Sequence, residues 1–486
     1  MTEINYDNWE PVIGLEIHVQ LNTKTKLFGE ERYQFGTEPN TDIGVVCTGQ
    51  PGTLPVLNKE AVKKAVQFGC AIHANISPVS KFDRKSYFYP DSPKNFQITQ
   101  FDMPIILGGT ITCEVEGGLK HFKVNRAHIE EDSGMLKHFT NFSGIDYNRA
   151  GTSLLEIVSE PCLHSPKDAV SYATSIKAIM EYIDASDCNM DEGSLRIDVN
   201  ISVRHKNEKE LRNKVEIKNM NSFSYMAIAI EEEIRRQIKF YTSHPHDKIE
   251  KGTYRFDPEK KALVMMRTKE NAEDYGYIPE PDIPPITLTQ AFIEEIRSAL
   301  PELPYARYKR YLSDLQLPVQ FAEVLVGSKR LSDYFQEALA ITPNARSLAN
   351  WITVEFAGRL KETGRQLWDL PIPPSHIAEL VSLIDQGTIN GKIAKSVADD
   401  MVLSPTKPPA SIVKENPDYQ PVNDTKEIEA LIDQVLSENA QSITDYKAGK
   451  TKAFAFLVGQ VMKLCKGKAS PALVNEILIK KLASEA

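Results

Sequence analysis

Two segments far apart in the chain alternate apolar and polar residues with the period of a β-strand. Successive side chains of a strand point to opposite sides, so each segment would turn one apolar face toward a core. The opposite faces would carry Gly14, Glu16, His18 and Gln20 in residues 11–21, and Arg196, Asp198, Asn200, Ser202 and Arg204 in residues 196–204. This pattern is typical of an antiparallel sheet that is covered on one side.

The polar residues on these predicted faces are of the types that hold divalent metal ions and phosphates. Further acids, Glu130, Glu131 and Glu156, lie in short strand-like segments. Converging carboxylates repel one another and raise each other's pKa unless cations lie between them. Mg²⁺ takes carboxylate, water and phosphate oxygens, so a magnesium–phosphate site is the simplest compensation. A solvated outer face of the sheet is the alternative, and for a single strand it is the commoner case.

A basic cluster at residues 81–85 precedes an aromatic segment at residues 87–89. Lys81, Arg84 and Lys85 beside aromatic rings suit a nucleotide or an RNA end. The alternative is a structural group of ion pairs next to core aromatic residues. The residues alone do not decide between the two.

Proline-rich stretches predict the domain borders. The run at residues 279–285 cannot continue a helix or a central strand, and beyond it apolar residues recur at helical spacing. A second stretch interrupted by prolines, residues 404–423, suits a linker. We therefore expect a mixed domain over residues 1–290, a helical domain over residues 291–405 and a helical tail over residues 406–486.

The chain as a whole is acidic, but its tail is basic. A net charge of −9 over 486 residues argues against a protein that coats nucleic acid through bulk charge. Residues 447–486 nevertheless hold eight lysines and two glutamates, an excess of +6. This local excess fits contact with a phosphate backbone, and a solvated basic face is the alternative.

Composition also predicts the compartment. The six cysteines are dispersed without a Cys-x-x-Cys pair, which disfavours a disulfide framework or a cysteine zinc site. The polar N-terminus shows no secretory signal, and the most apolar stretch, residues 453–462, is too short to span a bilayer. We expect a cytoplasmic protein that contacts no membrane.

Nine runs of the chain, taken in order, resemble the B subunits of the bacterial tRNA-dependent amidotransferases. The runs are VIGLEIHVQL from Val12, GTLPVLN from Gly52, SKFDRKSYFYPDSPKNFQITQFD from Ser80, HIEEDSG from His128, DYNRAGTSLLEIVSEP from Asp146, MDEGSLRIDVNISVR from Met190, VEIKNMNSF from Val215, DYGYIPEPDIPP from Asp274 and AFLVGQVMK from Ala455. So many ordered runs make the resemblance far more specific than any single motif.

The resemblance implies an α+β fold. An antiparallel-sheet cradle domain, similar to that of glutamine synthetase-type carboxylate kinases, would precede an all-helical domain and a small helical tail domain that binds tRNA. The cradle would use ATP and Mg²⁺ to phosphorylate the side-chain carboxylate of Glu-tRNA(Gln) or Asp-tRNA(Asn), and ammonia would then displace the phosphate. The ammonia would come from a partner amidase (glutaminase), the A subunit, while a small C subunit would complete a heterotrimer.

The resemblance also implies the residues of the site. The metal ligands would be Glu16, His18, Glu131 and Glu156. The catalytic residues would be Glu16, His18, Glu130, Arg149 and Arg196, and the residues that bind nucleotide and phosphate would be Lys81, Arg84, Lys85 and Asp198. Alternation places Glu130 with His128 on one face, whereas the family has a ligand at Glu130 or Glu131. The choice within this pair stays open.

The chain departs from the family pattern in two places. Many members hold zinc with four cysteines near residues 27–49, where this chain has Cys47 alone, so we expect no zinc. Gly276 stands where many members have an arginine, so any role of that side chain is absent or taken over elsewhere. Two other functions compete. A non-catalytic tRNA-binding scaffold is disfavoured by the acid cluster, and a free-standing small-molecule carboxylate–amine ligase is disfavoured by the basic tail.

Overall fold

The structure is a computed structural model that describes residues 6–260, 262–268, 275–419, 425–447, 450–465, 469 and 471–484. The chain divides into two compact units, Met1–Arg307 and Tyr308–Ala486. Three features of the sequence analysis lie partly outside the described residues. They are Asp274 of the eighth matching run, residues 420–423 of the predicted linker, and Lys466 and Lys468 of the basic tail.

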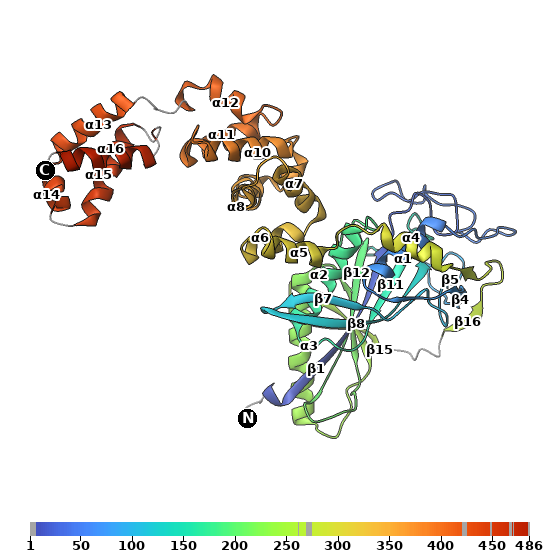
Figure 1. The fold of residues 1–486 in the computed structure, drawn as a ribbon. Helices are drawn as coiled ribbons and strands as arrows, with labels where there is room; N and C mark the ends of the chain where they lie inside the picture. The colour runs from blue at the N-terminus through green and yellow to red at the C-terminus, as the bar shows by residue number, and fades with distance from the viewer. Residues whose placement is uncertain are drawn as a thin grey trace. The chain divides into compact units, whose positions relative to one another are not determined.

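The described residues of the first unit form a ten-stranded sheet (Figure 1). Its order is β15-β14-β13-β12-β1-β11-β8-β6-β2, and β7 pairs with β8. β1 (Trp9–Gln20) lies between β11 (Ser153–Ser159) and β12 (Leu195–His205), so both segments with the alternating pattern are central strands. The other strands are β2 (Asn75–Ile76), β6 (Ile106–Leu107), β7 (Thr110–Val115), β8 (Gly118–Glu131), β13 (Val215–Met220), β14 (Gly252–Asp257) and β15 (Ala262–Thr268).

One pair of neighbouring strands is parallel, so the sheet is mixed and not purely antiparallel as predicted. β13 and β14 run in the same direction. The helix α3 (Phe223–Ser243) lies between them in sequence and carries the chain back along the sheet, as a parallel connection requires. The strands β1, β8, β11 and β12 pair antiparallel, as predicted.

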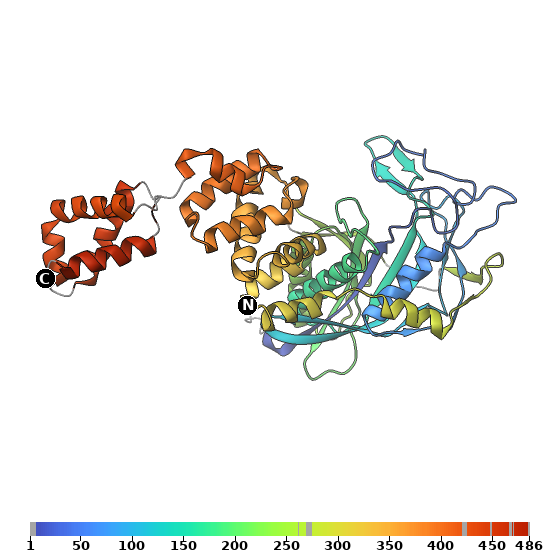
Figure 2. The same cartoon turned by 45° about the horizontal axis from the view of Figure 1, so that its top comes forward.

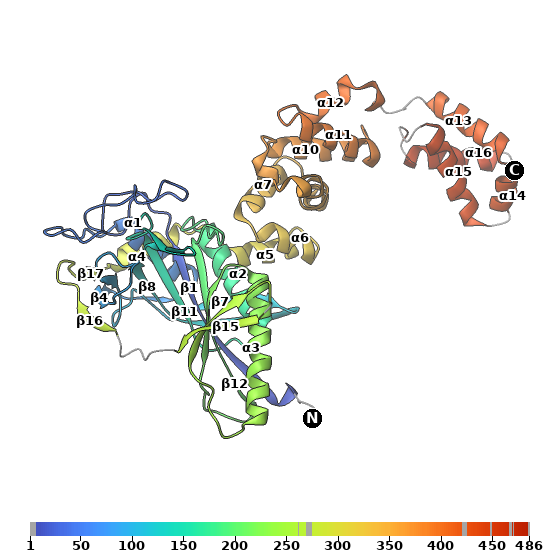
Figure 3. The same cartoon turned by 180° about the vertical axis from the view of Figure 1, so that it is seen from behind.

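Helices cover the apolar face of the sheet. α2 (Pro166–Tyr182) contacts β1, and α3 contacts β12 and β13 (Figure 3). Both helices begin at a serine, Ser165 and Ser222, whose side chain accepts a hydrogen bond from a backbone N–H of the first turn. The β1 side chains beneath them are almost completely buried: Ile13, Leu15, Ile17 and Val19. The polar face of the central strands is therefore left for other contacts.

Three smaller sheets accompany the main sheet in the described part of this unit. β4 lies between β5 and β16, β9 pairs with β10, and β3 pairs with β17. Their bounds are β3 (Val79–Ser80), β4 (Asp83–Ser86), β5 (Phe96–Thr99), β9 (Met135–His138), β10 (Ser143–Asp146), β16 (Gly276–Pro279) and β17 (Ile286–Thr287). The predicted basic cluster thus belongs to β4 and the residues just before it.

The first unit extends beyond the border predicted at residue 290. α4 (Gln290–Ser298) lies beside α1 (Lys59–Ala71) (Figure 2). Its Ile293 and Ile296 are buried in the same core as the sheet. The boundary falls after Arg307, within α5 (Pro304–Ser313). The change of period marks where helices begin, but the packing of α4 decides where the unit ends.

The second unit is helical over its described residues. Its helices are α6 (Val319–Val326), α7 (Lys329–Leu339), α8 (Ala345–Asn350), α9 (Ala357–Leu360), α10 (Pro374–Asp385), α11 (Gly391–Leu403), α12 (Pro409–Glu415), α13 (Thr425–Glu438), α14 (Ala440–Lys447), α15 (Thr451–Leu464) and α16 (Pro471–Ser484). The last four enclose a core of their own, which includes Ile428, Ile432, Leu457, Val461 and Leu478. A division near residue 405 stays a prediction. In the described residues, no helix combines the length and the hydropathy needed to cross a membrane.

Candidate active site

The register of the central strands brings together polar residues that are distant in the chain. His18 of β1 lies opposite Glu156 of β11 and opposite Arg196 of β12. Glu16 of β1 lies opposite Asp198 of β12. Residues that pair across neighbouring strands project to the same side, so these five side chains share the face that α2 and α3 do not cover.

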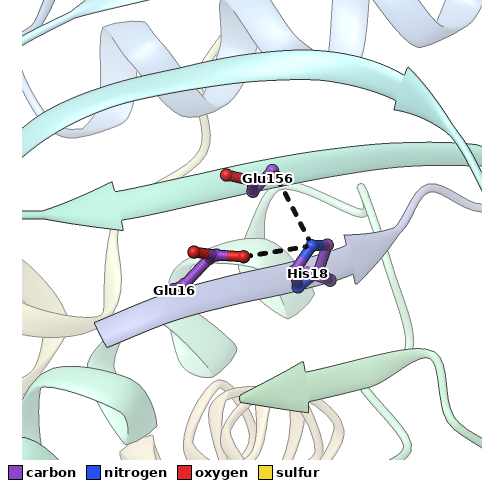
Figure 4. Close-up of side chains that lie close together, drawn as sticks. All are labelled: Glu16, His18 and Glu156. Atoms are coloured by element: carbon purple, nitrogen blue, oxygen red, sulfur yellow. Dashed lines mark ion pairs between the residues drawn. The ribbon is translucent and has the colours of Figure 1, made fainter. Parts of the chain in front are cut away.

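His18 lies among three carboxylates. Its Nε2 atom is 3.4 Å from Glu156 Oε2, 3.7 Å from Glu130 Oε1 and 3.8 Å from Glu16 Oε1. Figure 4 shows Glu16 and His18 extending from β1 toward Glu156. His128 lies next to them, with Nε2 at 3.5 Å from a carboxylate oxygen of both Glu130 and Glu156. Two overlapping groups could each hold a metal ion, Glu16–His18–Glu156 and His128–Glu130–Glu156.

The charges in this cluster shift one another's pKa values. Burial would lower the pKa of His18, but Glu156, Glu130 and Glu16 raise it to about 9. Burial and the charge of Glu156 raise the pKa of Glu16 to about 7. Burial would raise the pKa of Glu156, but His128 and His18 hold it well below its usual range. The cluster thus holds protons that a bound cation would replace.

A cavity of about 360 Å³ opens on this face. Lys85 of β4, Arg196 of β12 and Lys218 of β13 line it together with the acids. Lys218 Nζ lies 3.2 Å from Asp198 Oδ2, and the carboxylates of Asp198 and Glu216 outweigh burial and raise the pKa of Lys218. One cavity therefore combines carboxylates that suit a divalent cation with ammonium and guanidinium groups that suit phosphate.

The carboxylate of Asp132 positions both predicted arginines. Arg196 Nη2 donates to Asp132 Oδ2 at 2.6 Å, and Arg149 Nε lies 3.4 Å from the same oxygen. Arg149 also donates to the carbonyl oxygens of Ser133 and Gly134, at 3.0 and 2.9 Å. Nε of Arg196, by contrast, is buried without a hydrogen-bond partner. Arg149 lines the cavity with its donors largely engaged, whereas Arg196 lines it with one donor unpaired.

Glu131, a predicted metal ligand, lies away from His18. Its carboxylate forms an ion pair with Lys94 and accepts a hydrogen bond from Ile98 N at 2.9 Å. Glu130 instead approaches His18 and accepts a hydrogen bond from Thr99 Oγ1 at 3.1 Å. Adjacent residues of a strand point to opposite faces, so only one of the two glutamates can join His18. The geometry favours Glu130 in place of Glu131.

The predicted phosphate ligands of the basic cluster divide in the same way. Lys85 lines the cavity, whereas Lys81 and Arg84 do not. Lys81 Nζ lies 2.9 Å from the carboxylates of two aspartates, and Arg84 Nε lies 2.6 Å from Glu280 Oε2. Both form ion pairs with acids on or next to the smaller sheet, and their predicted contact with nucleotide stays a prediction. For these two residues the geometry favours the alternative interpretation, a structural group of ion pairs.

Sequence reasoning missed two residues of this face, His128 and Lys218. His128 lies two residues before Glu130 on β8, and Lys218 lies two residues after Glu216 on β13. Period-two alternation was the available signal for both. It was not decisive, because it relates residues within one strand and does not say which strands are neighbours.

A second hollow of about 530 Å³ lies further along β1 and β12. Gly14 and Asn200, which continue the polar faces of these strands, line it. The absence of a side chain at Gly14 leaves space, and Oδ1 of Asn200 is buried without a hydrogen-bond partner. Three basic residues also line it, Arg212, Lys214 and Lys251. The size and the mixed polar and apolar lining suit a nucleoside with phosphates attached.

The two positions that depart from the family pattern have ordinary surroundings. Cys47 is buried, its Sγ accepts a hydrogen bond from Gly44 N at 3.1 Å, and Lys26 Nζ lies 3.6 Å away. Gly276 pairs with Ser86 on the edge strand β16. The residue before it, Tyr275, lines the cavity. In this register Gly276 shares the side of Ser86, whereas the neighbouring residue of β4, Lys85, lines the cavity.

Comparison with known proteins supports one assignment over nearly the whole chain. Residues 11–294 match the family described as the GatB/GatE catalytic domain, and residues 333–482 match the family described as the GatB domain. The B subunit of the aspartyl/glutamyl-tRNA(Asn/Gln) amidotransferase of Protochlamydia amoebophila is 64% identical, over 99% of this chain and 98% of the relative. Proteins of the same name from Chlamydia abortus and Chlamydia caviae are each 56% identical, over 98% of this chain and 99% of each relative.

Proposed function

This chain belongs to the family of aspartyl/glutamyl-tRNA(Asn/Gln) amidotransferase B subunits, and we propose that its first unit activates the side-chain carboxylate of a misacylated tRNA with ATP. The substrates are Glu-tRNA(Gln), Asp-tRNA(Asn) or both. Phosphorylation gives an acyl phosphate, and ammonia converts it to the amide of Gln-tRNA(Gln) or Asn-tRNA(Asn). The first unit would then catalyse the same class of reaction as the glutamine synthetase-type carboxylate kinases.

One observation carries this proposal. A single cavity combines three carboxylates around His18 with Lys85, Arg196 and Lys218. A carboxylate does not react with ammonia at a useful rate, whereas an acyl phosphate offers a good leaving group. Phosphoryl transfer needs mainly positioning and neutralisation of charge, and these are the properties that such a cavity supplies.

The donor set fits a divalent cation. Glu16, Glu130 and Glu156 offer carboxylate oxygens, and His18 offers one ring nitrogen. The raised pKa of His18 follows from the three surrounding carboxylates, whose negative charge a divalent cation would also neutralise. Carboxylate oxygens suit both Mg²⁺ and Mn²⁺. When bound, the ion would neutralise charge on the transferred phosphoryl group.

The cations of the cavity would bind the phosphates. Arg196 is oriented by Asp132, and Lys218 is oriented by Asp198. Lys85 approaches from the smaller sheet, where the carboxylates of Glu130 and Glu156 outweigh burial and raise its pKa, so it is charged at neutral pH. The nucleoside of ATP would occupy the hollow lined by Gly14 and Asn200. Asp198 would lie near the bound phosphates as the partner of Lys218.

The remaining parts of the assembly follow from the family. A partner amidase would release ammonia from glutamine, and a small third protein would complete a heterotrimer. The basic tail would contact the tRNA backbone, because five described lysines, Lys450, Lys452, Lys463, Lys480 and Lys481, lie on or next to α15 and α16. A zinc site and a membrane contact are not expected, and a cytoplasmic location stays a prediction.

The test is made on the complex purified with its partners from the native cell. Recovery of an amidase partner and glutamine-dependent amidation of Glu-tRNA or Asp-tRNA would support the proposal. Glu16→Ala and Glu156→Ala should abolish the phosphate release that depends on ATP and aminoacyl-tRNA, while tRNA binding persists. Normal turnover in both variants would instead favour the alternative of a non-catalytic tRNA-binding scaffold.

A further inference from the structure

Asp91 stands apart from the other acids of the cavity. Asp132 is paired with Arg196 and Arg149, Asp198 is paired with Lys218, and the glutamates surround His18. Asp91 also lines the cavity, but within the described parts of the chain no cation forms an ion pair with it. Its Oδ1 atom is buried and has no hydrogen-bond partner.

The backbone around Asp91 is fixed on both sides. Ser92 N donates to Tyr89 O at 2.9 Å, Gly134 N donates to Asp91 O at 2.9 Å, and Tyr147 Oη donates to Pro90 O at 2.8 Å. These bonds tie the Tyr89–Ser92 turn to the chain that follows β8. The carboxylate is thus held in the cavity wall by a rigid turn and not by a mobile loop tip.

An unpaired buried carboxylate oxygen is costly, so it calls for a physical explanation. Burial raises the pKa of Asp91, and the Ser133 hydroxyl only partly offsets this effect. Arg149 is the cation whose charge acts on Asp91, but it donates to the carbonyls of Ser133 and Gly134. Oδ1 of this cavity-lining carboxylate is therefore an acceptor that the described residues leave unsatisfied.

We infer that Asp91 receives a protonated amine nitrogen of the substrate. The inference rests on the proposed function, whose reaction supplies two such groups. One is the ammonium that becomes the amide nitrogen, and the other is the α-ammonium of the esterified amino acid. Both are compact cations that donate hydrogen bonds, and a carboxylate with a free oxygen is the group that recognises them.

For the first source the proton balance is simple. Ammonium transfers one proton to the Asp91 carboxylate, and neutral ammonia attacks the carbonyl carbon of the acyl phosphate. A C–N bond forms, the C–O bond to phosphate breaks, and phosphate leaves with the electron pair and takes a proton from the nitrogen. For the second source Asp91 binds the α-ammonium without any change of bonds and fixes the aminoacyl group beside the acids around His18.

The test compares Asp91→Asn with the unchanged complex, with ammonium chloride as the nitrogen donor. Asp102→Asn is the matched control, because Asp102 is exposed, does not line the cavity and undergoes the same substitution. Three quantities are measured: the KM for ammonium, the KM for aminoacyl-tRNA, and phosphate release at saturating aminoacyl-tRNA without a nitrogen donor. Loss of a buried charge partner should raise one KM by about tenfold or more.

The outcomes separate the two sources. A raised KM for ammonium, with the other two quantities within about twofold, assigns Asp91 to the incoming ammonium. In that case hydroxylamine, which is largely unprotonated near neutral pH, should be used almost as well by Asp91→Asn as by the unchanged complex. A raised KM for aminoacyl-tRNA alone assigns Asp91 to the α-ammonium.

Two results would overturn the inference. In the first, both KM values of Asp91→Asn match those of Asp102→Asn. In the second, phosphate release and the reactions with ammonium and with hydroxylamine all fall together, as expected for a purely structural role. Failure of the proposed function is distinguishable from either, since the unchanged complex would then release no phosphate in response to aminoacyl-tRNA.

Discussion

His18 and Glu156 face each other across β1 and β11, and Nε2 of His18 lies 3.4 Å from Oε2 of Glu156. Glu156 also lies 3.5 Å from His128, so it belongs to both groups of the candidate metal cluster. The pair joins a strand at the start of the chain to one that follows the β9–β10 hairpin. Neither residue would indicate a metal site alone.

Glu130 and Glu131 provide a matched pair of substitutions. We expect Glu130→Gln to lower phosphate release in response to aminoacyl-tRNA by roughly 100-fold, because it removes a carboxylate that contacts His18. Glu131→Gln should keep the rate of phosphate release within about threefold. It should lower the free energy of unfolding by a few kcal/mol, because Lys94 loses a buried partner. Single-turnover phosphate release and thermal unfolding measure the two effects. A larger loss of phosphate release in Glu131→Gln than in Glu130→Gln would indicate that Glu131 is the metal ligand of this pair.

Metal binding should depend on pH because a proton competes for His18. The pKa of His18 is raised to about 9, and that of Glu16 to about 7. Below these values the ligands hold protons that the ion must displace, so affinity rises with pH, by about tenfold per unit for His18 alone, and levels off above pH 9. Calorimetric titration with Mg²⁺ or Mn²⁺ in buffers of different ionisation enthalpy should detect proton release. An affinity independent of pH between 6 and 9 would contradict this prediction.

The basic tail offers a test of tRNA contact by charge. Lys452 and Lys463 are exposed at opposite ends of α15, and neither forms an ion pair with a described residue. Replacing both with glutamine should weaken tRNA binding and reduce the slope of log K against log salt by roughly one to two units. Lys480→Gln is the comparison and should reduce the slope less, because Glu476 already pairs with Lys480. Deletion of residues 426–486 should have a larger effect of the same sign, and unchanged affinity would remove the tail from the tRNA contact.

Position 276 should accept the arginine that many family members carry. A Cβ at Gly276 would meet only Ser86 Cβ, at 3.9 Å, and β16 is an edge strand of its sheet. We expect Gly276→Arg to change the free energy of unfolding by less than about 0.5 kcal/mol. Thermal or denaturant unfolding measures this change. A loss of several kcal/mol would mean that the surroundings of this strand do not tolerate a side chain.

Local periodicity was enough to predict the strands that carry the site. Alternation in residues 11–21 and 196–204 corresponds to β1 and β12, with apolar side chains such as Ile17 buried under the helices. The onset of helical spacing after the proline-rich run likewise predicted the helical region. These features depend on interactions between residues close in sequence, or on which side of an element is apolar, and both can be read from one chain.

Alternation also contained information about the pair Glu130 and Glu131. It placed Glu130 and His128 on one face, and that is the face that approaches His18. The resemblance pointed to the pair without choosing a member. The sequence therefore contained the periodicity that separates Glu130 from Glu131. It did not show which strand lies next to them, and so did not show which of the two approaches His18.

What the sequence by itself determined was the type of each element, the polar face of each strand and the family of the chain. Only the tertiary structure decided that Glu16, His18, Glu130 and Glu156 meet, that Lys85 joins them while Lys81 and Arg84 pair with acids elsewhere, and that α4 belongs to the first unit. The physical reason is that strand order and register arise from the packing of the whole core. A period of two says which way a side chain points, but not what it meets.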